Sequence, residues 1–172
     1  MPKPIMNVVD VSLDPASPDW APTGPAAERF GAKTGVIGAR IGARRLGYNI
    51  TAVPAGMRAW PFHNHPAKEE MFFVLQGSGE VRIGDARYPI RTGDIIACPA
   101  GGRETAHQII NTGTEELRYL CVSTEHSLEM AQYPDSGKFA VKAELGTAPD
   151  GTPQRVIFVG RETQSVDFWD GE

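Results

Sequence analysis

The stretch HNHPAKEEMFFVLQG, residues 63–77, combines two closely spaced histidines with an acidic residue and an apolar run. In an extended chain, residues two apart point to the same face, so the rings of His63 and His65 would lie about 6.5–7 Å apart along it. Glu70 opens the apolar run and would share a strand face with Phe72. A carboxylate beside apolar side chains is costly unless it is paired or bound to a metal ion. Taken alone, the paired histidines fit either two exposed loop residues or a metal site on one face of a β-sheet, and the surrounding sequence decides between the two.

The chain around this stretch has the strand rhythm of an all-β protein. Between residues 34 and 124, short apolar runs alternate with glycine-bearing turns, so that a new strand begins roughly every eight to twelve residues. This repeat distance is typical of a β-sandwich or β-barrel. The expected strands are Val36–Ile41, Leu46–Val53, Glu70–Leu75, Gly79–Ile83, Ala86–Ile90, Asp94–Cys98, Thr105–Asn111 and Glu116–Thr124. Helical periodicity is nearly absent, and the best candidate is a brief turn near Ser127–Gln132. An all-β fold class with few helices follows.

The two ends of the chain differ from this central region. Residues 1–33 hold six of the fourteen prolines, which predicts an extended N-terminal arm with one short helical turn or an edge strand near Val8–Leu13. The tail keeps a β character, with expected strands at Lys138–Ala143, Arg155–Val159 and Ser165–Trp169. The sequence therefore predicts one β-barrel domain over residues 34–172, preceded by the arm.

Composition excludes several function classes. The formal net charge of −4 and the lack of a basic cluster argue against nucleic-acid binding. No apolar run approaches the ~20 residues that span a bilayer, and the N-terminal sequence lacks an apolar secretory stretch, so a cytoplasmic location is expected. Cys98 and Cys121 are then expected to be buried free thiols.

The spacing of glycines, histidines and the glutamate extends the pattern in both directions. It reads Gly56, six residues, His63-x-His65, four residues, Glu70, six residues, Gly77, and then Gly93, five residues, Pro99-x-Gly101, five residues, His107, three residues, Asn111. This closely resembles the two signature motifs of the cupin superfamily, over roughly residues 45–125. The turn before the last histidine is longer than the family's usual spacing.

The resemblance implies a double-stranded β-helix, the jelly-roll barrel of small metal-binding cupins. By resemblance the metal ligands are His63, His65, Glu70 and His107. Counting back from Gly77 selects Glu70 over its neighbour Glu69, which then faces solvent or the mouth of the site, because adjacent strand residues face opposite ways. The cofactor is one divalent metal ion, with iron, manganese, zinc and nickel left open.

Five further residues are candidates for binding a substrate. They are Arg58, Trp60, Tyr48, Arg103 and Tyr119. The arginines would pair with an anionic substrate or be solvated loop charges. The tyrosines, which lie in expected strands, would line the pocket or belong to the core. His126 is expected at the surface.

Three functions fit this reading. The first is a metal-dependent enzyme acting on a small polar or anionic substrate, as a dioxygenase, an isomerase or a lyase. The second is a non-catalytic module that binds or senses a small ligand, and the third is a purely structural metal. Small cupins often form dimers, so a homodimer is also expected, with the arm as one means of reaching a second subunit.

Overall fold

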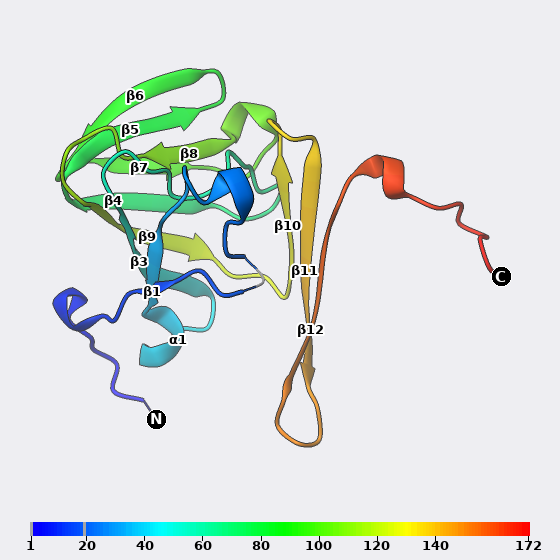
Figure 1. Ribbon diagram of the computed structural model, residues 1–172. Coiled ribbons are helices and arrows are strands. Elements are labelled where there is room, and N and C mark those ends of the chain that lie inside the picture. The colour runs from blue at the N-terminus through cyan, green and yellow to red at the C-terminus, as the bar shows by residue number, and fades with distance from the viewer. Residues whose placement is uncertain (1, 19) are drawn as a thin grey trace.

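The computed structural model describes residues 2–18 and 20–172, and its regular secondary structure consists mainly of antiparallel strands (Figure 1). Met1 and Asp19, both in the expected arm, lie outside the described residues. One sheet has the order β1 (Asp14–Pro15), β2 (Lys33–Val36), β3 (Leu46–Val53), β9 (Leu117–Thr124), β4 (Glu70–Gln76) and β7 (Ile95–Cys98). A second sheet has the order β6 (Ala86–Arg91), β5 (Ser78–Ile83) and β8 (His107–Ile110). The prediction of an all-β barrel with few helices is confirmed.

A third sheet stands beside this barrel. It contains β10 (Leu128–Tyr133), β11 (Lys138–Thr147) and β12 (Pro153–Gly160), and the hairpin of β11 and β12 extends well past the barrel in Figure 1. Backbone hydrogen bonds between Asn64 and Gln132, at 3.0 and 2.9 Å, connect β10 to the segment that carries the paired histidines. The third sheet is therefore a wall of the region around that segment.

The alternation of side chains along β9 shows which of its faces forms the barrel interior. In β9 every second residue from Leu117 to Ser123 is buried, and β3 pairs with it along its whole length, from Leu46 opposite Thr124 to Val53 opposite Leu117. The main core cluster is formed by Ala32, Val53, Ala59, Phe72, Val74, Val81, Ile90, Ile96, Cys98, Ile109, Leu117, Tyr119 and Cys121. This packed interior holds the strands on which the polar site is built.

The N-terminal arm is attached to the first sheet. The short strand β1 pairs with β2, and Val11 packs with Ile37 and Ile50 in a second apolar cluster. A Cβ atom at Gly35 would collide with the side chain of Val11 and the carbonyl oxygen of Ser12, so only glycine permits this close approach.

Three local predictions were wrong. The strand expected at Val36–Ile41 ends at Val36, and residues 38–41 form the short helix α1 (Gly38–Ile41), which ends at Gly42 with a φ of 90°. Ser127–Gln132 is not a helical turn, because β10 occupies this segment and pairs with β11 through six residues. Ser165–Trp169 forms no strand, since it has no strand partner among the described residues.

The remaining short helical elements are 3-10 turns. They cover Val8–Asp10, Gly24–Ala26, Arg103–Thr105 and Glu162–Gln164. The first two lie in the arm, where one helical turn was expected. In the part of the chain that the structure describes, no helix has both the length and the apolar character needed to cross a membrane.

Candidate metal centre

Four ligand-type side chains from three parts of the chain converge at one end of the barrel. His63 and His65 lie in the segment before β4, Glu70 is the first residue of β4, and His107 is the first residue of β8. Each offers one donor atom, and these four atoms all lie within 4.8 Å of one another. An ion bound at about 2.0–2.2 Å from each donor would hold the donors roughly 3–4 Å apart, so small side-chain shifts would close the set around it.

The backbone brings the two histidine segments together. The amide of His107 donates to the carbonyl oxygen of His63 at 2.7 Å, and the amide of His63 donates back to His107 at 3.2 Å. Between the paired histidines, the buried Asn64 side chain donates to the carbonyl oxygen of Gly101 and to Oε1 of Gln132, each at 2.8 Å. Asn64 therefore points away from the cluster, as expected, and anchors the loop that carries its two neighbours.

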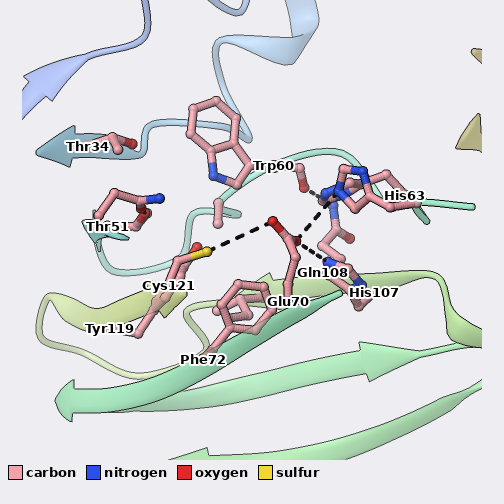
Figure 2. Close-up of a pocket in the computed structure, with 14 residues that line it drawn as sticks. Thr34, Thr51, Trp60, His63, Glu70, Phe72, His107, Gln108, Tyr119 and Cys121 are labelled. Carbon is pink, nitrogen blue, oxygen red and sulfur yellow. Dashed lines mark hydrogen bonds and ion pairs between the residues drawn. The ribbon is translucent and has the colours of Figure 1, made fainter. Parts of the chain in front are cut away.

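Each imidazole ring is held from behind through its Nδ1 atom. Nδ1 of His63 lies 2.7 Å from the carbonyl oxygen of Pro61, and Nδ1 of His107 lies 3.3 Å from that of Thr105. A carbonyl oxygen only accepts, so Nδ1 of His63 carries a proton and its Nε2 keeps a free lone pair, which is the tautomer that metal-binding histidines need. Nε2 of His107 lies 3.1 Å from the Glu70 carboxylate, which also only accepts, so this contact needs a proton on Nε2 that a bound metal ion would replace. Figure 2 marks the contact between Glu70 and His107 with a dashed line.

His65 is held by a residue that the sequence reading did not single out. Its Nδ1 lies 2.7 Å from Oε1 of Glu129, which projects from β10, and its Nε2 lies 3.6 Å from Glu70. The second oxygen of Glu129 lies 3.7 Å from Nζ of Lys68. A carboxylate behind a metal-binding histidine orients the ring and strengthens it as a donor. Only the contact with β10 reveals Glu129, because nothing in its local sequence marks it.

The electrostatics of the cluster favour a cation. Burial and the neighbouring rings of His107 and His65 lower the pKa of His63 to about 3, so it is neutral. Burial opposes a charge on His65, but its hydrogen bonds to Glu129 and Glu70 raise its pKa to about 9. Burial also opposes ionisation of Glu70, yet its hydrogen bonds to His107 and His65 hold its pKa well below the usual range. The cluster thus has an ionised carboxylate at its centre and holds a proton where a metal ion would bind.

The cluster opens into a cavity of about 260 Å³. Trp60 and Tyr119 line it, together with polar residues from β2 and β3, namely Thr34, Asn49 and Thr51. Burial raises the pKa of Tyr119, whose phenol therefore stays protonated. The buried Oγ1 of Thr34 has no hydrogen-bond partner among the residues that the structure describes, and a buried hydroxyl of this kind is available to a ligand. Figure 2 shows Thr34, Thr51 and Trp60 around the space beyond Glu70.

A larger cavity of about 850 Å³ adjoins the first and shares Trp60, His63 and His65 with it. Its walls come from the arm, from the histidine segment and from the third sheet. Its basic residues are Arg29, Arg58, Lys138 and Lys142. The structure therefore places Arg58, Trp60 and Tyr119 in the walls of the two cavities.

Two other candidates lie elsewhere. Tyr48 packs in the second apolar cluster, on the face of β3 opposite to Thr51, because alternate strand residues face opposite sides. Arg103 is exposed in the turn before β8, where it lies 3.6 Å from the carboxylate of Asp85, and it lines neither cavity. As expected, Glu69 and His126 are exposed.

The two cysteines are buried free thiols, as expected. Cys121 lies with its sulfur 3.9 Å from Oε1 of Glu70, and burial raises its pKa. Burial and the nearby Glu70 carboxylate raise the pKa of Cys98 to about 12. Both thiols therefore stay protonated at neutral pH.

Comparison with known proteins finds a matching domain within the chain. Residues 49–123 match the family described as Cupin domain. Protein SchB of Streptomyces halstedii is 34% identical over 89 residues, which is 52% of this chain and 59% of SchB. The chain spans about half the length of the curated relatives that it matches.

Two solved structures extend the likeness beyond these residues. A putative sugar phosphate isomerase from Acidithiobacillus ferrooxidans has a TM-score of 0.62 and 26% identity, over 77% of this chain and 78% of that one. A sugar phosphate isomerase of the cupin superfamily from Silicibacter pomeroyi has a TM-score of 0.74 at 21% identity, over 96% and 98% of the two chains, a likeness that concerns the fold. Residues 49–123 thus match a cupin domain, and the two solved structures share the fold of the chain around it.

Proposed function

We propose that this chain is a divalent-metal enzyme of the cupin superfamily that acts on a small anionic substrate, with sugar phosphates as the first candidates. The observation that carries the proposal is the convergence of four donor atoms at the base of a cavity of about 260 Å³. A structural metal would need no such space beside it. A bound ion would be held by His63, His65, Glu70 and His107, and it would supply Lewis acidity to a substrate oxygen.

The chain's own residues would bind and orient the substrate. Thr34 has an unpartnered buried hydroxyl in the cavity, which suits a substrate hydroxyl or carbonyl group. Trp60 and Phe72 supply apolar walls that exclude water from the reacting end. Glu129 would keep His65 oriented while the substrate is bound. These roles need no movement of the barrel strands.

The preference for an anion rests on Arg29 and Arg58. Both line the larger cavity, and among the residues that the structure describes neither forms an ion pair with an acidic side chain. The acidic residues of this cavity are already engaged, because Asp135 pairs with Arg82 at 2.7 Å and Glu129 with His65. Free guanidinium groups bind phosphate and carboxylate groups in a two-pronged manner. The solved isomerase structures named above support testing phosphorylated sugars first.

The test combines metal analysis with an isomerisation assay. Protein purified without added metal should contain about one divalent ion per chain, and its identity should separate an iron oxygenase from a zinc or manganese isomerase or lyase. Chelation should abolish the interconversion of a sugar phosphate followed by NMR, and the same ion should restore it. Unchanged turnover by the metal-free protein would contradict the proposal. Tight binding of these compounds without turnover would favour the alternative, a non-catalytic ligand-binding module.

Matched variants locate the chemistry. Glu70→Gln should lose the metal ion, whereas Glu69→Gln, changed at the exposed neighbour, should keep it. Arg58→Ala should raise KM for a phosphorylated substrate about tenfold or more while kcat changes little, since the interaction is present in both ground and transition states. An unchanged KM in Arg58→Ala would remove the anion part of the proposal alone.

A homodimer is a further part of the proposal. The sheet edges of the chain need a cover, and a second copy would supply one. The cytoplasmic location stays a prediction from the sequence.

A further inference from the structure

The third sheet presents two faces of opposite character. Strand pairing sets Glu129 opposite Lys142 and Ile157 on the face that lines the larger cavity. The alternate positions form the other face, which we call the outer face. Its members are Leu128, Met130 and Gln132 of β10, Phe139, Val141 and Ala143 of β11, and Val156 and Phe158 of β12.

The outer face has no charged residue, and Gln132 is its one hydrogen-bonding side chain. It is open to solvent in one copy of the chain, where Leu128 is 63% exposed, Val156 49% and Phe158 45%. A sheet face that meets water normally carries polar side chains at these positions, as the cavity face does. Contiguous exposed apolar patches of more than a few hundred Å² usually mark an interaction site.

The C-terminal segment, residues 161–172, is a second exposed apolar element of the same chain. Phe168 is 84% exposed and Trp169 72%, and their rings contact each other with centroids 4.9 Å apart. Val166 is also largely exposed. In Figure 1 this segment leaves β12 and runs away from the barrel, so it covers no part of its own core.

We infer that the outer face and the C-terminal segment form the interface of a homodimer. In this dimer the outer face packs on the outer face of a second copy of this chain, and the C-terminal segment packs on the C-terminal segment of that copy. A fully buried aromatic side chain removes about 150–250 Å² from water. Seven large apolar side chains of the two elements, each about one-third to four-fifths exposed, therefore offer roughly 600–800 Å² per copy. A stable interface of standard size buries about 800 Å² per partner.

The position of β12 strengthens the choice of a second copy. It is an edge strand of its sheet, with no strand on its far side among the described residues. Two copies related by a two-fold axis would cover both of these apolar elements at once, because each chain carries both the face and the segment. The same sheet forms a wall of the larger cavity, so the interface would also support the back of that wall. This inference rests on the proposed homodimer and not on the metal chemistry.

The test is the mass in solution of the full chain and of three variants by light scattering after size exclusion. The wild type should have twice the mass of one 18.6 kDa chain. Phe158→Asp should give the single-chain mass at micromolar concentration, while Ile95→Asp, at an exposed apolar residue of β7, should stay dimeric. Trp169→Ala, which alters an exposed side chain outside the barrel core, should raise the dimer dissociation constant at least tenfold.

The outcomes separate the two claims. A monomeric wild type would overturn the homodimer and this interface together and would leave the metal enzyme standing. A dimeric wild type whose mass is unaffected by both Phe158→Asp and Trp169→Ala would overturn the interface alone. Circular dichroism and metal content confirm that each variant is folded, and Trp169→Ala keeps the test decisive if Phe158→Asp does not fold.

Discussion

Glu129 offers the sharpest test of the metal centre, because it contacts a ligand without being one. Its Oε1 lies 2.7 Å from Nδ1 of His65, and the pair is largely buried. Removing an outer partner of this kind typically costs 10–100-fold in metal affinity. A hydrogen bond to a charged group contributes about 1.5–3 kcal/mol, which corresponds to about 10–150-fold. The two estimates agree, so Glu129→Ala should weaken metal binding about 10–100-fold.

Competition with a chromophoric chelator for Zn²⁺ measures this change directly. Glu129→Gln keeps an oxygen that accepts from Nδ1 but loses the charge, so it should lose less affinity than Glu129→Ala, roughly three- to tenfold. The matched control is Glu125→Ala, at an exposed acidic residue of the same region that reaches Ser123 and no histidine. A folded Glu129→Ala variant that binds Zn²⁺ within twofold of the wild type would refute this account of His65.

Three further outcomes test the core, the thiols and the metal. Leu117→Ala removes a fully buried side chain and should lower the free energy of unfolding, measured in urea, by about 2–5 kcal/mol. The control Leu46→Ala, at an exposed position, should lower it by under about 1 kcal/mol. Equal losses in the two variants would argue against the described core. The pKa of Cys98 is raised from 9.0 to about 12. At pH 8.5 the fraction of Cys98 present as thiolate should therefore be roughly a thousandfold smaller in the folded chain than in the unfolded chain. Rapid alkylation of Cys98 in the native protein would contradict its burial. A divalent ion at 100 times its Kd should stabilise the chelated protein by about 2.7 kcal/mol, seen as a higher Tm, and Glu70→Gln should show no such shift.

Much of the barrel could be predicted from local patterns. The strand β3 has the predicted bounds, and β4 to β6 differ from the expected ranges by one residue at an end. Glycine turns separate β4, β5 and β6, and buried positions alternate along β4 and β5, and both signals are short-range. The segment at Ser127–Gln132 was mistaken for a helical turn because it lacks β-branched residues. It is a strand because β11 pairs with it.

The candidate ligands were also accessible from the sequence, since the resemblance to the two cupin motifs implies His63, His65, Glu70 and His107. The residues that surround these ligands in the folded protein could not be predicted in this way. Glu129 comes from β10 and Thr34 from β2, and both reach the site only through strand pairing between distant segments. Tyr48 and Tyr119 looked equivalent in sequence, yet only Tyr119 reaches the cavity.

Residue type and spacing thus predicted the strand pattern and the resemblance to the cupin motifs, from which the candidate metal ligands followed, because each motif depends on neighbours within a few positions. Three features depend instead on which strands lie side by side. They are the hydrogen bond to the far ring nitrogen of His65, the basic lining of the larger cavity and the apolar outer face of the third sheet. Strand register sets which side of each strand turns inward, and register is a property of paired segments far apart in the chain. For this reason only the folded molecule distinguished Tyr119 from Tyr48 and brought Glu129 to His65.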